Sequence, residues 1–184
     1  MSKKAVSVGV IKAEESECSE NSMIIAGSVC KFFTHPDDDS EYSAACCRYL
    51  KCKDLVRVKV NDGYELVFAS SADKELEQDE NGEFVVDESD LNMAAMFILK
   101  QYSMKDESAY DGSTPAIFSD VIVMRKNHDG AYVDVCMDDF VSRVSGLYNS
   151  AVSLEKLATD KSGRDKSDDA SSYRGNGLPK FSEN

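Results

Sequence analysis

The chain has 184 residues, a length that suits one domain of ordinary size, with or without an appended tail. Its 34 acidic and 21 basic residues leave a net charge of −13, which repels nucleic-acid phosphates. The sequence carries no basic patch that would override this field, so we expect no direct binding of DNA or RNA.

The first apolar run extends only from Ala5 to Ile11 and lacks the small-residue cleavage site of a secretory signal. No other run approaches the length of a membrane span. We therefore expect no membrane association and a cytoplasmic location, or a virion location if the chain is phage-encoded. In such a compartment the six cysteines stay reduced.

The first part of the chain predicts two strands and a helix. Valines alternate with smaller or polar residues from Ala5 to Ala13, which is typical of a strand. A second strand is predicted from Ser22 to Phe33, with a bend or bulge at Gly27. Three consecutive aspartates then supply the capping oxygens and negative charge that a helix start favours. They predict a first helix from Asp39 to Cys52.

The clearest hairpin joins Leu55–Val60 to Tyr64–Ala69 through Asn61-Asp62-Gly63. A three-residue loop with Gly63 in the left-handed region fixes the register. The predicted facing pairs are Val60 with Tyr64, Val58 with Leu66, and Lys59 with Glu65. One face of this hairpin is then apolar, and the other carries paired charge.

A second helix is predicted from Ser89, which serves as its cap, to about Ser103. Its apolar residues cover so wide a surface that the helix is either central and buried or faces a partner. The stretch from Met104 to Pro115 is polar and reads as a loop.

The last structured segment is a hairpin followed by the longest helix. Ala116–Lys126 and Ala131–Met137 are β-rich and flank the turn Asn127–Gly130. The helix is predicted from Asp138 to Asp160. Its apolar residues alternate in steps of four and three and form one narrow seam. The seam consists of Phe140, Val144, Leu147, Ala151, Leu154 and Ala158.

These elements follow one another as hairpin, helix, hairpin, helix, hairpin, helix. Clustered hairpins with helices predict an α+β fold in ββα-ββα-ββα order, with residues 1–160 as a single domain. Residues 161–184 are polar and carry Tyr173, Leu178 and Phe181 as their only large apolar side chains. This segment is predicted to be an extended or disordered C-terminal arm, because it cannot bury enough surface to offset its ordering entropy.

One stretch has the spacing of calcium ligands in an EF-hand loop. The candidate ligands are Glu77, Asp79, Asn81, Glu83 and Glu88. The first position carries Glu where Asp is usual, the ninth carries Val85, and the preceding segment is too short for the entering helix. A turn at Asn81-Gly82 in a solvated acidic connector accounts for the same residues. We therefore predict neither a metal nor a cofactor.

No catalytic constellation emerges from the remaining polar residues. Cys46, Cys47 and Cys52 lack the spacing that brings zinc ligands together, so most of the cysteines are predicted to be small buried hydrophobes. His35 and His128 adjoin carboxylates, but no Ser or Cys lies in a recognised nucleophile motif. No glycine-rich phosphate loop is present. Enzymatic activity is therefore not favoured.

The sequence favours a non-enzymatic structural or assembly subunit that binds neighbouring protein chains through its last helix and C-terminal arm. Such a subunit would be a homo-oligomer or part of a larger assembly. One alternative is an acidic regulatory binder, such as an inhibitor or nucleic-acid mimic, since carboxylates can imitate phosphates. A second alternative is a calcium-binding protein or an enzyme without a recognisable motif. The small size and acid-rich loops are in keeping with a phage or mobile-element protein.

Overall fold

The computed structural model describes residues 2–19, 21–35, 37–71, 77–82, 85–102 and 115–149. The chain divides into a compact unit, Met1–Leu147, and a second unit, Tyr148–Asn184, of which only Tyr148 and Asn149 are described. Predictions for the rest of the last helix and for the arm therefore lie outside the described residues. They concern Ala151, Leu154, Ala158, Tyr173, Leu178 and Phe181.

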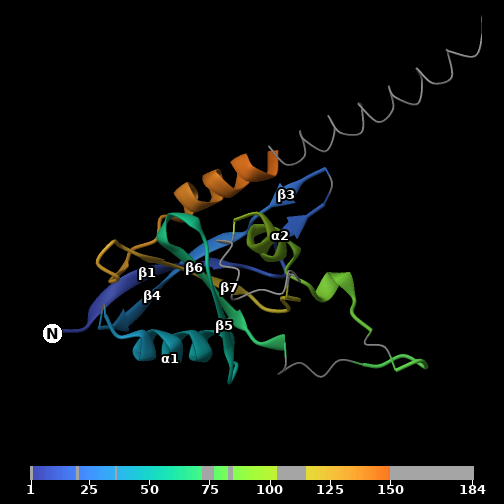
Figure 1. The fold of residues 1–184 in the computed structure, drawn as a ribbon, viewed down its shortest axis with the longest axis horizontal. Coiled ribbons are helices and arrows are strands. Elements are labelled where there is room, and N and C mark those ends of the chain that lie inside the picture. Colours follow the sequence, from blue (N-terminus) through green and yellow to red (C-terminus); the bar gives the residue numbers. More distant parts are fainter. Residues whose placement is uncertain are drawn as a thin grey trace, which may run out of the picture. The chain divides into compact units, whose positions relative to one another are not determined.

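The first unit is built on an antiparallel sheet, and the fold is α+β (Figure 1). Its principal strands are β1 (Lys4–Ile11), β4 (Gly27–Thr34), β5 (Leu55–Lys59), β6 (Tyr64–Ala69) and β7 (Val121–Lys126). They lie in the order β4-β1-β7-β6-β5, and the short strand β8 (Tyr132–Val133) pairs with the end of β7. A separate pair is formed by β2 (Glu17–Cys18) and β3 (Met23–Ile24).

The predicted ββα-ββα-ββα order is not matched. Four strands, not two, precede the first helix α1 (Asp39–Leu50), because the segment between β1 and β4 folds into the β2–β3 pair. The acidic stretch after β1 thus contributes one of these short strands, Glu17–Cys18. The second helix, α2 (Met93–Tyr102), follows β6, and a last helix is described over residues 137–149.

The start of α2 differs from the prediction because Asn92, not Ser89, is the cap. The Asn92 side-chain oxygen accepts a hydrogen bond from the Ala95 backbone N–H at 3.1 Å. Its amide nitrogen donates to the Ser119 carbonyl at 3.1 Å, which fixes this fully buried side chain. Ser89 instead lies in the short 3₁₀ helix Glu88–Asp90. The helix is thus capped by a buried asparagine that also bonds to a distant segment, and not by the serine predicted from the local sequence.

The last hairpin is shorter than predicted. Its first strand begins at Val121, because the preceding residues bond elsewhere: the Ile117 carbonyl accepts from the Asn92 N–H at 2.7 Å. The returning strand comprises only Tyr132–Val133. Beyond it the Asp134 carboxylate accepts from the Ser7 N–H at 2.7 Å, so the chain turns to β1 and enters the last helix at residue 137.

The register predicted for the β5–β6 hairpin is confirmed. Val58 faces Leu66, Lys59 faces Glu65, and the Val60 N–H donates to the Tyr64 carbonyl at 2.9 Å. Gly63 has a φ of +74°, and a Cβ at this position would lie 2.6 Å from the Lys126 carbonyl oxygen. The face predicted to carry paired charge does so through Arg57 and Glu65, 2.7 Å apart, although β6 is an interior strand that is buried on both sides.

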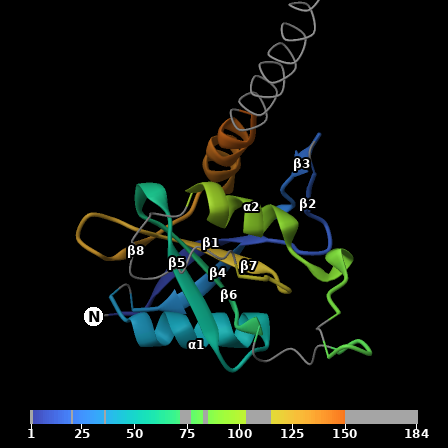
Figure 2. The same ribbon diagram turned by 45° about the vertical axis from the view of Figure 1, so that its right-hand side comes forward.

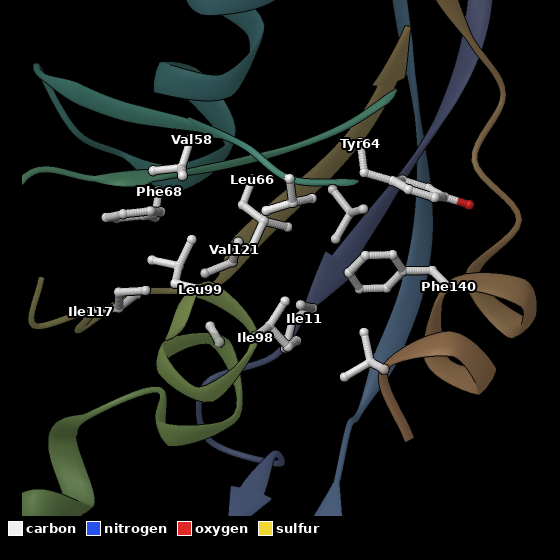
Figure 3. Packing of buried hydrophobic residues seen from close by; sticks show 14 of the residues in the cluster. Ile11, Val58, Tyr64, Leu66, Phe68, Ile98, Leu99, Ile117, Val121 and Phe140 are labelled. Carbon is white, nitrogen blue, oxygen red and sulfur yellow. The ribbon is translucent and has the colours of Figure 1, made fainter. Parts of the chain in front are cut away.

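Two hydrophobic clusters lie on opposite faces of the sheet. Because side chains alternate along a strand, Leu66 and Val123 enter one cluster while Val67 and Ile122 enter the other. We call the first side the α2 face, since α2 and the last helix contribute to its cluster (Figures 2 and 3). We call the other side the α1 face, where α1 supplies Tyr42, Ala45 and Cys46.

The last helix packs closely on the sheet because β1 has a glycine beneath it. A Cβ on Gly9 would lie 2.0 Å from the Met137 Sδ and 3.2 Å from the Val123 Cβ. In the same cluster, the centres of the Phe140 and Tyr64 rings lie 5.1 Å apart (Figure 3). The described part of the seam, Phe140 and Val144, therefore packs into the α2-face cluster of this chain.

Candidate functional site

The most exposed apolar feature of the described chain lies on β4. This strand pairs with β1, and no described strand pairs with its other edge. Phe32 and Thr34 are buried on the α1 face, whereas Val29 and Phe33 project from the opposite face with 53% and 68% of their surface exposed. Lys31 lies between them on the same side, because every second side chain shares a face.

We call Val29, Lys31 and Phe33 the edge strip. The last helix covers only the beginning of β4: a Cβ on Gly27 would lie 2.9 Å from the Met137 Cε and 3.9 Å from Val141. Farther along β4, the β1 residues opposite Lys31 and Phe33 are Ser7 and Ala5, which cover little. The edge strip therefore stays exposed on a sheet that is otherwise covered by helices.

The main chain of the edge strip also faces outward. The N–H of Ser7 donates to Asp134 and its carbonyl accepts from Val135, so Ser7 has no backbone group left for Lys31 opposite. In an antiparallel pair, hydrogen-bonded and non-hydrogen-bonded residues alternate. It follows that Val29, Lys31 and Phe33 direct their N–H and C=O groups away from β1, toward the open edge.

The opposite edge of the sheet, β5, is different. It has five residues where β4 has eight, and none of the exposed large hydrophobic residues of the described chain belongs to it. Its Arg57 side chain turns under α1 into a charged cluster. An open edge with exposed apolar side chains, which invites strand pairing, is thus found at β4 and not at β5.

The charged cluster lies on the α1 face and consists of Asp39, Arg57, Glu65, Lys126 and Tyr132. Arg57 donates to Glu65 Oε2 at 2.7 Å and also to the Tyr132 hydroxyl. The same hydroxyl donates to Asp39 Oδ1 at 2.5 Å, and Lys126 donates to that oxygen at 2.9 Å. Two cations, two carboxylates and one phenol thus form a closed network.

The protonation states in this network favour a structural role over a catalytic one. Burial, together with the hydrogen bond to Asp39, raises the pKa of Tyr132, so the phenol stays protonated. Hydrogen bonds from Tyr132 and Lys126 lower the pKa of Asp39, which stays ionised. Every charged member already has a partner of opposite charge. The cluster therefore anchors α1 to β5, β6 and β8.

A second polar group joins His35, Asp38 and Glu41, whose potential metal-ligating atoms lie within 4.8 Å of one another. Glu41 binds Lys3 at 2.9 Å and accepts the His35 N–H at 2.8 Å. Asp38 caps α1 by accepting from the Ser40 and Glu41 N–H groups, which confirms the predicted capping role of this aspartate run. These contacts account for the grouping without an ion.

The candidate calcium ligands are arranged as a turn where they are described. Asp79 accepts the Asn81 N–H at 2.8 Å and its carbonyl accepts the Gly82 N–H at 3.0 Å, as predicted for an Asn81-Gly82 turn. Gly82 has a φ of +81°. Glu77 accepts the Val85 N–H through its carbonyl, and Glu88 begins a 3₁₀ helix. Glu83 lies outside the described residues.

The six cysteines are free thiols, and the prediction that most are buried is wrong. Only Cys46 is buried, and this burial raises its pKa to about 12. Cys136 is exposed, and the other four are half-buried. The cysteines of α1 and its end diverge because neighbouring helical residues point about 100° apart.

An open hollow of about 540 Å³ lies between the turns at residues 61–63 and 127–130. Its charged side chains are already engaged: Asp62 binds Arg143 at 2.8 Å, Lys126 binds Asp39, and the Arg125 guanidinium lies 5.2 Å from the centre of the Tyr64 ring. His128, 89% exposed, lies 3.2 Å from the Asp129 carboxylate. The hollow therefore offers a ligand few unpaired charges.

Of the residues predicted as an interface, three lie within the described part of the chain: Phe140, Val144 and Leu147. Phe140 and Val144 are 0% and 1% exposed and belong to the α2-face cluster, and half-buried Leu147 packs against it. This part of the seam is occupied by the protein's own core and is not free for a neighbour. The sequence analysis did not identify the edge strip as a site. Two consecutive phenylalanines in a strand point to opposite faces, so Phe32 and Phe33 indicated that both faces of this strand carry apolar side chains.

No helix among the described residues is long and apolar enough to cross a membrane. Comparison of the sequence with protein-family models and curated proteins, and of the fold with solved structures, found no match. The function must therefore be argued from the geometry of this chain.

Proposed function

We propose that the protein is a non-enzymatic assembly subunit that binds a partner protein by adding a strand of that partner to β4. The observation that carries this proposal is the edge strip, where exposed apolar side chains and outward-facing backbone groups coincide. Added strands gain affinity from main-chain hydrogen bonds and specificity from alternate side chains. Both elements are present on β4.

This proposal keeps the assembly role favoured by the sequence but moves the contact surface. The seam residues Phe140 and Val144 are buried in the chain's own core, whereas Phe33 is exposed and apolar. Exposed apolar surface of this kind is a recurring mark of protein-binding sites. The arm of residues 161–184 remains in the proposal as a second contact, through Tyr173, Leu178 and Phe181.

The experiment uses a library of ten-residue peptides with alternating apolar and polar residues, with binding followed by fluorescence polarisation. Members of the library should bind the full chain, and N-methylation of alternate peptide amides should abolish binding by removing the main-chain donors. Amide exchange should slow at residues 29, 31 and 33. It should change little at residues 28, 30 and 32, whose amides are already paired with β1.

A matched pair of variants tests whether the side chains of the edge strip take part. Val29→Ser should weaken peptide binding about tenfold. Val85→Ser removes an equally exposed valine, also 53% accessible, from another part of the chain and should leave binding unchanged. Failure of every peptide to bind, or protection confined to residues outside β4, would contradict the proposal.

A further inference from the structure

We infer that the strand received by β4 belongs to a different protein and carries an acidic residue between two apolar ones, in the order apolar-x-acidic-x-apolar. This inference rests on the proposed function and names the partner's chemistry. It follows from the order of the edge strip, in which Lys31 separates Val29 from Phe33. Among the described residues, no acidic side chain forms an ion pair with Lys31.

The side chains that a new strand would meet are set by sheet geometry. Directly opposite residues of neighbouring strands lie on the same face, with their Cβ atoms about 4.5 to 5.5 Å apart. A residue opposite Lys31 is therefore within ion-pair reach, and residues two positions away on either side meet Val29 and Phe33. Opposite charges favour such a pair and like charges disfavour it, so the central residue is Asp or Glu.

The negative charge of the whole chain does not overturn this preference. The net charge of −13 is spread over the molecule, and at physiological salt its field is screened beyond about 8 Å. The Lys31 contact acts at shorter range than that. In an acidic protein, an unpaired cation centred in an exposed apolar strip selects an acidic partner locally.

A second copy of this chain fits the same edge poorly. If two β4 strands paired antiparallel so that each Val29 met the other's Phe33, Lys31 would lie opposite Lys31. Shifting the register by two residues relieves that repulsion but separates Val29 from Phe33: one direction places Phe33 opposite Gly27, which has no side chain to contact, and the other places Val29 opposite His35, beyond the end of β4. Lys31 thus acts against self-pairing, a common use of lysine on edge strands.

The test compares two ten-residue peptides that differ only in their central residue, Val-x-Glu-x-Phe and Val-x-Lys-x-Phe, with otherwise identical polar positions. The parent chain should bind the Glu peptide about three- to tenfold more tightly than the Lys peptide. In Lys31→Glu the preference should reverse. Raising the salt concentration should shrink both preferences, because the charges are exposed.

The outcomes separate this inference from the proposed function. Equal binding of both peptides with loss in Val29→Ser would overturn the acidic specificity while leaving strand addition to β4 intact. A dimer of the parent chain in light scattering that neither peptide displaces, and in which amide exchange is slowed at residues 29, 31 and 33, would show that a second copy occupies the edge, and would overturn the inference. So would failure of both peptides to bind while other members of the library bind at β4. Thermal unfolding of Lys31→Glu serves as the folding control.

Discussion

The two faces of the sheet are stabilised in different ways. On the α2 face, side chains from β6, β7, α2 and the last helix form an almost entirely apolar cluster. On the α1 face, a smaller apolar cluster is joined by the charged cluster of Asp39, Arg57, Glu65, Lys126 and Tyr132. The same strands serve both faces, so the difference arises from which residues occupy alternate positions.

This difference shows what each face contributes. Apolar burial is nondirectional and scales with the area removed from water, so the α2 face supplies stability. The charged cluster is directional, and its cations must be desolvated before they pair. Arg57 Nε is in fact buried without a hydrogen-bond partner among the described residues. The charged cluster thus fixes the position of α1 on the sheet more than it adds to the free energy of unfolding.

The largest expected effect is the loss of a ring from the α2 face. Phe140→Ala should lower the free energy of unfolding by about 3 to 5 kcal/mol, because the ring is fully buried and contacts Tyr64. Leu147→Ala should cost less, since Leu147 is only half-buried. Chemical denaturation measures both changes. Equal losses in the two variants would show that burial on this face does not set the cost.

The next effect concerns the charged cluster. Glu65→Gln should lower the free energy of unfolding by about 1 to 3 kcal/mol, because it leaves the largely buried Arg57 guanidinium without its closest anion. The double variant Arg57→Met with Glu65→Leu should recover most of this loss, since an apolar pair needs no desolvation. A double variant less stable than Glu65→Gln would mean that the charged cluster contributes net stability.

The α2 face was largely predictable from the sequence, and the reason is local. The Asn61-Asp62-Gly63 turn predicted the register of β5 and β6, and the four- and three-residue steps of the last helix identified Phe140 and Val144 as members of one apolar seam. The turn and the helical spacing each lie within a few residues. Patterns of this range are read directly from side-chain periodicity.

The charged cluster could not be predicted, because its members come from distant segments. Arg57 and Tyr132 are 75 positions apart, and Asp39 and Tyr132 are 93 positions apart. Each residue alone looks like an ordinary surface side chain. The sequence therefore predicted paired charge on one face of the β5–β6 hairpin, but not that β6 lies inside the sheet and that this face receives α1.

The edge strip escaped prediction for a related reason. The sequence predicted that β4 is a strand, but not where it lies in the sheet. The far side of β1 pairs with β7, which is distant in sequence, and β4 is left as the outermost strand. The apolar seam of the last helix was likewise ambiguous. A seam has the same spacing whether it packs on its own sheet or on a partner, and the structure places Phe140 and Val144 on their own sheet.

The smallest expected effect is a pH dependence at the start of α1. The ion pair with Lys3, together with the His35 N–H, lowers the pKa of Glu41 to about 2, against about 4.5 for an unperturbed glutamate. The depressed pKa means that the unfolded chain takes up this proton first. The stabilisation is therefore complete above about pH 4.5 and is lost as the pH falls toward 2.

Melting temperatures measured between pH 6 and 2 test this contribution on the α1 face. Glu41→Gln should melt below the parent chain at pH 6, and the difference should shrink toward pH 2, where the parent also becomes neutral at this position. In Lys3→Ala the loss should be smaller and should end at a higher pH, because the largest cause of the depressed folded-state pKa is removed while the unfolded-state pKa is unchanged. Glu15→Gln, an exposed glutamate outside α1, should run parallel to the parent curve. If the melting temperature of Glu41→Gln instead stayed parallel to that of the parent over the whole range, the Lys3–Glu41 contact would not stabilise α1 in solution. The charged cluster around Tyr132 would then be the charged group that positions α1 on this face.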